Sequence, residues 1–382
     1  MRQKNLEKLL EKEVSAENES RPLIFNLRDP RAQRLLTRLF ADGRVRSVVD
    51  VYQEQLREYT AIMHPDCTRE NGFDALFEKY LKRLLERGPL WQHGRWIYFP
   101  WLGALVHILP GAQFQVVRMA RNRELITQEE QKEFFNTIVG VAGLSVGNSA
   151  ALAIVMEGGA QHIRLADHDT LALSNMNRIR AGVQNLGLEK TEMTAREIYT
   201  INPYAKIELF SDGLHEKNLD KFISGPPRLD IMVDEIDNLH MKYLLRKAAQ
   251  RSRIPVVMAT DNGEMSIIDI ERYDVDPSTP FFHHRMGDIS QGALSHLTKK
   301  ETGVKIMEFV GRENMQERMT HSLAQIGETL VSWPQLGSTA LLNGAALSYC
   351  VRKIATDTLQ NDDRQIIDLG QLLGGQRHSI TS

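Results

Sequence analysis

The stretch "TIVGVAGLSVGNSAALAIVMEGG", from Thr137 to Gly159, decides the fold. It begins with an apolar run of strand character, continues with a glycine turn and ends in small apolar residues typical of a helix. Such a turn places backbone N–H groups and a helix N-terminus where an anion can bind. Its glycines, Gly140, Gly143 and Gly147, do not fit the G-x-G-x-x-G spacing. Three interpretations therefore stay open for the loop: a dinucleotide site, an ATP site, or a plain connection between two elements.

Strand-like and helix-like segments alternate after this stretch, which is typical of an α/β domain with a mostly parallel sheet. The predicted strands lie at 162–167, 206–210, 229–237, 254–260 and 265–274, and the predicted helices at 188–202, 239–252 and 335–357. Residues 280–328 predict loops with short helices. We therefore expect a Rossmann-like, mostly parallel sheet with flanking helices over residues 118–382.

Residues 1–117 follow a different pattern and predict an N-terminal α+β domain. Helical periodicity marks 29–43, 48–64 and 73–88, the first with Asp29 as its cap and Pro30 at its first position. The later run "RWIYFPWLGALVHIL" predicts a hairpin that turns near Leu102 and Gly103. Pro100 would weaken its first strand or place that strand at an edge.

The composition is that of a soluble globular protein. The chain has 382 residues, is 42% hydrophobic and 25% charged, and carries a net charge of −2. That charge leaves no basic excess for a phosphate backbone, so we expect no nucleic-acid partner. Two cysteines, Cys67 and Cys350, cannot build a disulfide framework or a four-cysteine zinc site.

The sequence predicts neither a secretory signal nor a membrane span. The first residues, "MRQKNLEKLLEKEV", are charged and helical in period, unlike a secretory signal. The uncharged segment from Asn136 to Met156 is long enough to span a bilayer, but its glycines, serines and Asn148 favour strand, loop and helix. We expect a cytoplasmic protein without a membrane partner.

Charged residues after the glycine loop favour ATP over a dinucleotide. Asp167 lies twenty residues after Gly147, near the spacing of a ribose-binding acid. Arg178 and Lys190 follow it, and a triphosphate is commonly met by such cations. Asp237, at the end of a later strand, can hold Mg²⁺ at the phosphates. Taken singly, each residue also fits an ordinary role as a cap, a turn residue or a solvated charge.

The motifs resemble the ThiF/MoeB and ubiquitin-activating adenylyltransferases over roughly 118–357. "DHDTLALSNMNR" (167–178) is very like the family's D-x-D-x-V-x-x-S-N-L-x-R, and "DEIDN" (234–238) is similar to its D-x-x-D-N. Gly187 with Lys190, and "INPYAKI" (201–207), add to the likeness. The resemblance implies ATP and Mg²⁺ as cofactors. It implies nucleotide contacts from Gly140, Gly143, Leu144, Ser145, Asp167, Asp169, Asn175, Arg178, Lys190 and Asn238, with Asp237 as the Mg²⁺ ligand.

The family likeness also implies a homodimer in which an arginine before the first strand reaches the partner's ATP. "RMARNRELITQEEQ" (118–131) occupies that position, with Arg121 as the candidate and Arg123 in reserve. The implied catalytic set is then Arg121, Arg178, Lys190 and Asp237.

This sequence departs from the family pattern at several points. "GVAGLSVG" has Ala142 and Ser145 where the family's G-x-G-G-L-G-S has glycine, which allows a less close approach of backbone to phosphate. "DPSTPFFHHRMGD" (276–288) has no cysteine where many members bind zinc, and adjacent histidines such as His283 and His284 rarely ligate one metal, so we expect no zinc. Cys350 falls in an apolar helix, which predicts a buried, inert thiol.

These departures predict an enzyme that adenylates an acyl oxygen of a peptide and lets a substrate nucleophile displace AMP, as in zinc-less, cysteine-less peptide-tailoring members of the microcin and pantocin type. The N-terminal domain would hold the peptide, by strand addition along the hairpin's edge or not at all if the hairpin only packs. Other functions stay open: activation of a ubiquitin-like or sulfur-carrier protein, an NAD-dependent oxidoreductase, and a non-catalytic partner subunit.

Overall fold

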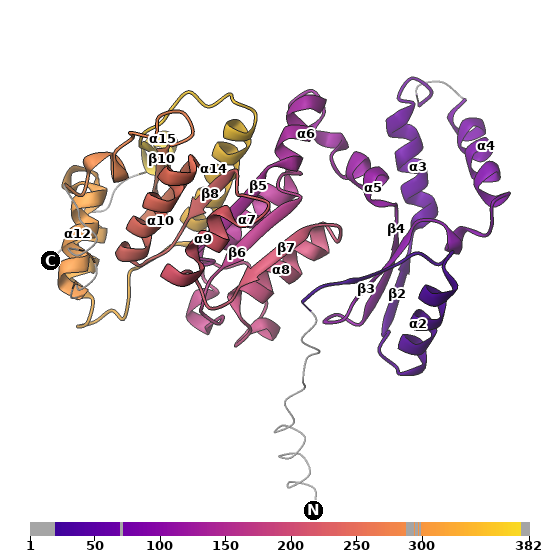
Figure 1. Ribbon diagram of the computed structural model, residues 1–382, viewed down its shortest axis with the longest axis horizontal. Coiled ribbons are helices and arrows are strands. Elements are labelled where there is room, and N and C mark those ends of the chain that lie inside the picture. Colours follow the sequence, from indigo (N-terminus) through magenta and orange to yellow (C-terminus); the bar gives the residue numbers. More distant parts are fainter. Residues whose placement is uncertain (1–19, 69–71, 288–293, 295–296, 298, 376–382) are drawn as a thin grey trace, which may run out of the picture. The chain divides into compact units, whose positions relative to one another are not determined.

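The structure is a computed structural model that describes residues 20–68, 72–287, 294, 297 and 299–375 (Figure 1). The chain forms two compact units, Met1–Leu125 and Ile126–Ser382. The limit drawn from the sequence, at 117, falls within helix α5 (Gly111–Arg118). Because α5 packs on α3 (Tyr52–Met63) of the first unit, the whole helix and the short turn after it stay with that unit.

Unit 1 is α+β, with a four-stranded sheet in the order β1-β3-β4-β2. Its strands are β1 (Leu23–Phe25), β2 (Ser47–Asp50), β3 (Arg95–Phe99) and β4 (Ala104–Ile108), and its other helices are α2 (Pro30–Ala41) and α4 (Phe73–Leu85). The hairpin is confirmed, since β3 and β4 pair antiparallel from Arg95 opposite Ile108 to Phe99 opposite Ala104. β2 pairs parallel with β4 and antiparallel β1 with β3.

Two expectations for unit 1 are wrong. Neither hairpin strand lies at an edge, because β1 and β2 flank them, and Pro100 opens the turn after β3. The predicted helix 48–64 begins only at Tyr52, since residues 47–50 form β2. Val48 and Val49 are β-branched residues that suit a strand, and their pairing with Leu105 and Val106 fixes that state.

Unit 2 confirms the predicted α/β fold with a mostly parallel sheet, in the order β11-β10-β9-β8-β5-β6-β7. Its strands are β5 (Ile138–Ala142), β6 (His162–Ala166), β7 (Lys206–Phe210), β8 (Ile231–Asp234), β9 (Val256–Asn262), β10 (Met265–Glu271) and β11 (Gln365–Asp368). The five strands from β9 to β7 run parallel, whereas β10 and β11 are antiparallel to their neighbours. The chain leaves β5 for β6 on one side and returns to β8 on the other, so the carboxyl ends of β5 and β8 form the switch point where α/β sheets bind ligands.

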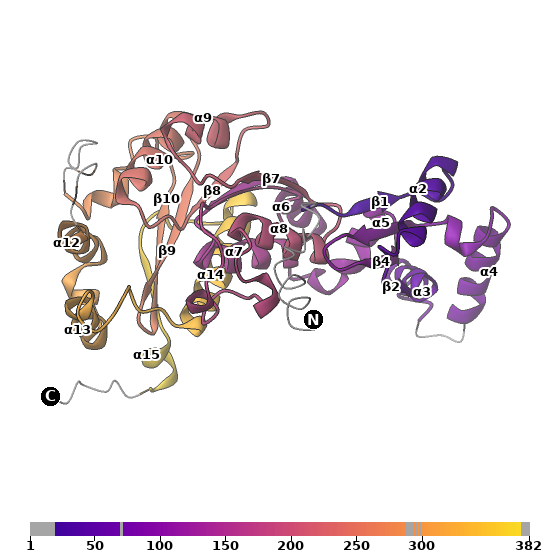
Figure 2. The same cartoon turned by 90° about the horizontal axis from the view of Figure 1, so that it is seen from below.

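Helices cover both faces of this sheet (Figure 2). They are α6 (Gln128–Asn136), α7 (Val146–Met156), α8 (Lys190–Ile201), α9 (Glu216–Ser224), α10 (Leu239–Ser252), α12 (Lys299–Val310), α13 (Glu317–Gln325), α14 (Gly337–Ala355) and α15 (Leu369–Leu373). α9 and α10 pack a cluster with Phe222 and Leu245 on one face, and α7, α8 and α14 lie on the other. α14 packs inside as predicted: a Cβ on Gly344 would lie 2.6 Å from the Ser149 Cβ of α7.

The uncharged segment 136–156 folds as the end of α6, strand β5, a loop and helix α7. Among the described residues, no helix combines the length and the apolar character needed to cross a bilayer.

Candidate functional site

The glycine loop joins β5 to α7 and is tied to the neighbouring strand ends. Gly143 has φ +85° and donates its N–H to Ala166 O (2.8 Å), and a Cβ there would lie 2.1 Å from Glu235 O. The next amide, Leu144 N, donates to Asp167 Oδ2 (2.6 Å). Only glycine fits where the loop passes so close to the end of β8.

The other predicted loop residues differ in what surrounds them. Gly140 lies within β5, where a Cβ would come 2.4 Å from Leu229 Cδ1 and 2.8 Å from the Phe222 ring, so its lack of a side chain serves packing. Ser145 stands at the N-cap of α7 without capping it, and its Oγ accepts a hydrogen bond from Arg178 Nε (2.9 Å). Ser145 thus links the loop to the predicted phosphate-binding arginine.

Asp167, Asp169 and Lys190 form one ionic cluster at the end of β6. Lys190 is 5% exposed, and its Nζ lies 2.8 Å from Asp169 Oδ2 and 3.9 Å from Asp167 Oδ2. The hydrogen bond from Lys190 lowers the pKa of the Asp169 carboxyl, against desolvation. The lysine's charge is therefore held beside the glycine loop by two carboxylates.

Arg178 brings a second cation to the loop. Besides Ser145, its guanidinium donates from Nη1 to Ser174 O (3.3 Å) and Asn177 Oδ1 (3.0 Å). Desolvation lowers the pKa of the Arg178 guanidinium, while the carboxylates of Asp261 and Asp237 act to raise it. Asn175 instead serves its own short helix, since its Oδ1 accepts from Ala172 N (3.0 Å).

Asp237 follows the end of β8 and has an exposed side chain. Desolvation by the surrounding protein raises the pKa of its carboxyl, Lys242, Lys190 and Arg178 favour the charged form, and Asp167 opposes it. The neighbouring Asn238 caps α10, because its Oδ1 accepts from Met241 N (2.9 Å). Asp237 thus interacts electrostatically with the charged side chains beside the glycine loop.

The donors at this edge fit a magnesium–triphosphate complex. Within the described part of the chain, the Asp237 carboxyl makes no side-chain hydrogen bond or ion pair, although three cations influence its pKa. A free carboxylate oxygen is a ligand that Mg²⁺ accepts, and Arg178 and Lys190 are of the type that meets phosphate oxygens.

The predicted arginines lie in unit 1, which the structure describes by itself. Arg121 is exposed in the turn Ala120–Asn122, and Arg123 donates from Nη1 to Ile62 O (3.3 Å). Their relation to the site in unit 2 stays a prediction.

Two site residues escaped the sequence analysis. Asp261, 4% exposed near the end of β9, accepts from Gln335 Nε2 (2.8 Å) and Asn343 Nδ2 (2.5 Å), and desolvation raises its pKa to about 6. Lys242 lies 3.2 Å from Asp234 Oδ2 and favours the charged form of Asp237. The available signal for Asp261 was an acid at the carboxyl end of a parallel strand, which the sequence analysis used only for Asp167 and Asp237.

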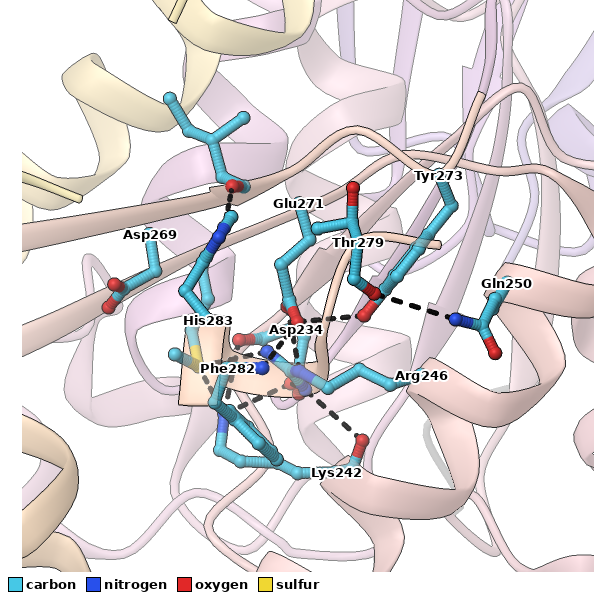
Figure 3. Close-up of polar contacts among 12 residues, drawn as sticks. Asp234, Lys242, Arg246, Gln250, Asp269, Glu271, Tyr273, Thr279, Phe282 and His283 are labelled. Carbon is cyan, nitrogen blue, oxygen red and sulfur yellow. Dashed lines mark hydrogen bonds and ion pairs between the residues drawn. The ribbon is translucent and has the colours of Figure 1, made fainter. Parts of the chain in front are cut away.

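A buried ionic network holds the end of β8 from below (Figure 3). Arg246 of α10 is fully buried. Its Nη1 lies 2.6 Å from Asp234 Oδ2, and its Nε lies 2.7 Å from Glu271 Oε2. Glu271 Oε1 accepts from Tyr273 Oη (2.8 Å) and from Phe282 N (2.7 Å), and the Phe282 ring lies 3.9 Å from the Arg246 guanidinium carbon. This network anchors the strand from which the Asp237 loop leaves.

The thiols and the histidine pair have ordinary surroundings. Cys350 is buried in α14, as predicted, and desolvation raises its pKa to about 11. Cys67 is partly exposed in unit 1. His283 Nε2 lies 2.8 Å from Ile270 O and its Nδ1 3.8 Å from Asp363 Oδ1. The end of the cysteine-free stretch, Asp288, lies outside the described residues.

The chain is similar in sequence to proteins from bacteria. An uncharacterized protein of Mycobacterium tuberculosis, MT1398, is 37% identical over 73% of this chain and 38% of its own length. The molybdopterin-synthase adenylyltransferase of Haemophilus influenzae is 28% identical over 44% of this chain and 66% of its own length. The chain therefore spans less than two thirds of either relative.

Among solved structures, the tRNA N6-threonylcarbamoyladenosine dehydratase TcdA of E. coli superposes with a TM-score of 0.44 at 19% identity, over 64% of this chain and 96% of that one. Residues 119–287 match the ThiF family. They include the glycine loop, Asp167, Arg178, Lys190 and Asp237. The similarity to the ThiF family thus covers residues 119–287, which include the candidate site.

Proposed function

We propose that the protein uses ATP and Mg²⁺ to adenylate an acyl oxygen, a carboxylate or an amide, on a peptide substrate. The acyl oxygen attacks the α-phosphorus, a new P–O bond forms, and the bond to pyrophosphate breaks. A nucleophile of the substrate then attacks the acyl carbon, and AMP leaves with the oxygen. No oxidant or reductant is needed.

One arrangement carries this proposal. Arg178 donates to Ser145 in the glycine loop, while Lys190, Asp167 and Asp237 lie within electrostatic reach of the same loop. They converge at the switch point of the sheet, where nucleotides bind in α/β folds. An NAD site would leave two cations and a free carboxylate at this point without a function.

The residues act by holding and neutralising charge. Asp167 would take the ribose hydroxyls, and the loop amides with Arg178 and Lys190 would hold the phosphate oxygens, so that attack on phosphorus starts from an aligned geometry. Mg²⁺ on Asp237 would supply further charge neutralisation when bound. Asp169 orients Lys190 through an ion pair of 2.8 Å.

Direct displacement of AMP is supported by the surroundings of Cys350, which is buried in α14. A thiol with a pKa of about 11 is almost entirely protonated near pH 7 and is a poor nucleophile. Unit 1 supports a peptide as the substrate, since among the described strands β2 pairs with β4 alone and so has a free edge, and its Val48 and Val49 are exposed. An extended peptide can add to such an edge through main-chain hydrogen bonds. We further propose a homodimer in which Arg121 reaches the partner's ATP.

A peptide-dependent ATP–pyrophosphate exchange assay tests the proposal. Candidate precursor peptides encoded near this reading frame are offered with ATP and Mg²⁺, with a Lys190→Met variant as the inactive control. We expect exchange that depends on the peptide and is lost in the variant. Exchange that ignores every peptide, or that survives Lys190→Met, contradicts the proposal.

A second candidate is adenylation of the C-terminal carboxylate of a small carrier protein, which the molybdopterin-synthase adenylyltransferase among the relatives favours. The same assay separates the two candidates. Exchange with a carrier protein that ends in a free, flexible tail, and none with peptides, would favour the second.

A further inference from the structure

Helix α2 of unit 1 lies in a segment with an unusual concentration of arginine. Between Arg21 and Arg46 the chain has seven arginines, no lysine and two acids, Asp29 and Asp42. The whole chain has 47 basic and 49 acidic residues. Because this segment is strongly basic, the rest of the chain has a larger excess of acidic residues. The charge is therefore local to this part of the molecule.

The fold turns these arginines into one surface. α2 buries Leu36 and Leu39 against the sheet of unit 1, in a cluster with Trp96 and Tyr98. Arg31, Arg34 and Arg38 are spaced by three and four residues and so share the opposite, solvent-facing side. We call these three residues the arginine face.

No ion pair neutralises the arginine face within the described part of the chain. Each of the three side chains belongs to an exposed residue, and none contacts a carboxylate. The nearest acid in sequence, Asp29, instead accepts the Arg31 N–H (2.8 Å) and caps the helix. Three guanidinium groups thus stand unpaired side by side, which costs repulsion unless an anion joins them.

We propose that the arginine face binds an acidic segment of a polypeptide. Arginine, unlike lysine, can bind a carboxylate through two parallel hydrogen bonds. All basic residues of this segment are arginines. Arg31 and Arg38 lie about 10 Å apart along the axis, at 1.5 Å per residue. An extended peptide covers that length with about three residues. The partner is therefore a polypeptide with a short run of Asp or Glu.

The neighbouring residue favours a polypeptide over nucleic acid. Leu35 is 46% exposed and adjoins Arg31 and Arg38 on the helix surface, since it lies four residues after the first and three before the second. An acidic peptide can offer an apolar side chain to it, whereas a phosphate backbone cannot. The acidic remainder of the chain also repels a long polyanion more than a short peptide. The idea that this polypeptide is the adenylated substrate rests on the proposed function. The charge complementarity is independent of that function.

Fluorescence anisotropy on the full-length protein tests the proposal, with a labelled peptide of consecutive glutamates as the probe. The triple variant Arg31→Glu, Arg34→Glu, Arg38→Glu should lose affinity at least about tenfold, because three carboxylate contacts become repulsions. The matched control, Lys79→Glu, Lys82→Glu, Arg83→Glu, makes the same charge change at exposed positions of α4 and should bind like wild type. Should the first variant fold poorly, Arg31→Gln, Arg34→Gln, Arg38→Gln replaces it.

Equal losses in both variants, or no binding by wild type, would overturn the proposal. So would an RNA oligonucleotide that binds more tightly than the peptide and depends on the same arginines. ATP binding is measured in parallel, since it belongs to unit 2. Binding of the acidic peptide without binding or cleavage of ATP would support the proposal for the arginine face and contradict the proposed function. Binding and cleavage of ATP without binding of the peptide would contradict only the proposal for the arginine face.

Discussion

At the scale of single residues, Asp237 carries the most specific expectation. Replacing it with alanine should abolish AMP formation, because the proposed Mg²⁺ ligand is lost. Because the side chain is exposed and makes no hydrogen bond to the described residues, the fold should stay intact, with a stability change within about 0.5 kcal/mol. AMP release and thermal melting are measured together.

The control for Asp237 is Asp220→Ala, which removes an exposed carboxylate paired with Arg251 and should leave AMP formation unchanged. Wild-type AMP release by Asp237→Ala would move the metal elsewhere. The next candidates would then be Asp167, His168 and Asp169, whose ligand atoms lie within 4.8 Å of one another.

The two cysteines should be dispensable for turnover. Burial raises the pKa of Cys350 to about 11, so the reactive thiolate is scarce at pH 8 and grows only as the pH approaches that value. The double variant Cys67→Ser, Cys350→Ser should turn over near the wild-type rate, with about 1 kcal/mol of stability lost at the buried position. A thioester trapped on the wild-type enzyme would contradict direct displacement of AMP.

At the scale of elements, the network around Arg246 should dominate the stability of unit 2. Arg246→Met should lower the free energy of unfolding by about 3–5 kcal/mol, because it leaves Glu271 buried without its cation and Asp234 paired with Lys242 alone. Urea denaturation measures the change. Arg251→Met, on the same helix but in an exposed pair with Asp220, should cost no more than about 1 kcal/mol. Similar losses for both variants would show that the buried network contributes nothing special.

The elements also show where sequence reasoning works and where it fails. The β5–α7 unit and the β3–β4 hairpin were predicted, because their patterns are local. β2 was missed, since residues 47–50 become a strand only by pairing with 104–107, far along the chain. β11 was not predicted for the same reason, as it pairs with β10 across about a hundred residues of sequence.

The candidate site divides in the same way. Asp167 and Asp237 are the last residues of predicted strands, so their convergence at one edge of the sheet could be expected. Asp261 lies near the site because β9 pairs beside β8, and Lys242 lies near it because of the way α10 packs. Neither arrangement can be predicted from the local sequence. The link between Ser145 and Arg178 likewise appears only in three dimensions.

At the scale of the whole molecule, the proposed homodimer predicts subunit complementation. Arg121→Ala and Asp237→Ala chains, each inactive alone, should recover about a quarter to a half of the activity when unfolded and refolded together, because one site of a mixed dimer has both residues intact. Activity of the mixture is compared with that of each variant alone. No recovery, with Arg121 or with Arg123 variants, would count against a shared site.

The most direct test of the account is isothermal titration calorimetry of the whole protein with ATP and Mg²⁺, and separately with NAD. The convergence of Arg178, Lys190 and Asp237 on the glycine loop predicts that ATP binds with Mg²⁺, that Asp237→Ala weakens this binding only when Mg²⁺ is present, and that NAD binds far more weakly. Tight binding of NAD together with no binding of ATP would contradict the central claim that this edge of the sheet is built for a triphosphate.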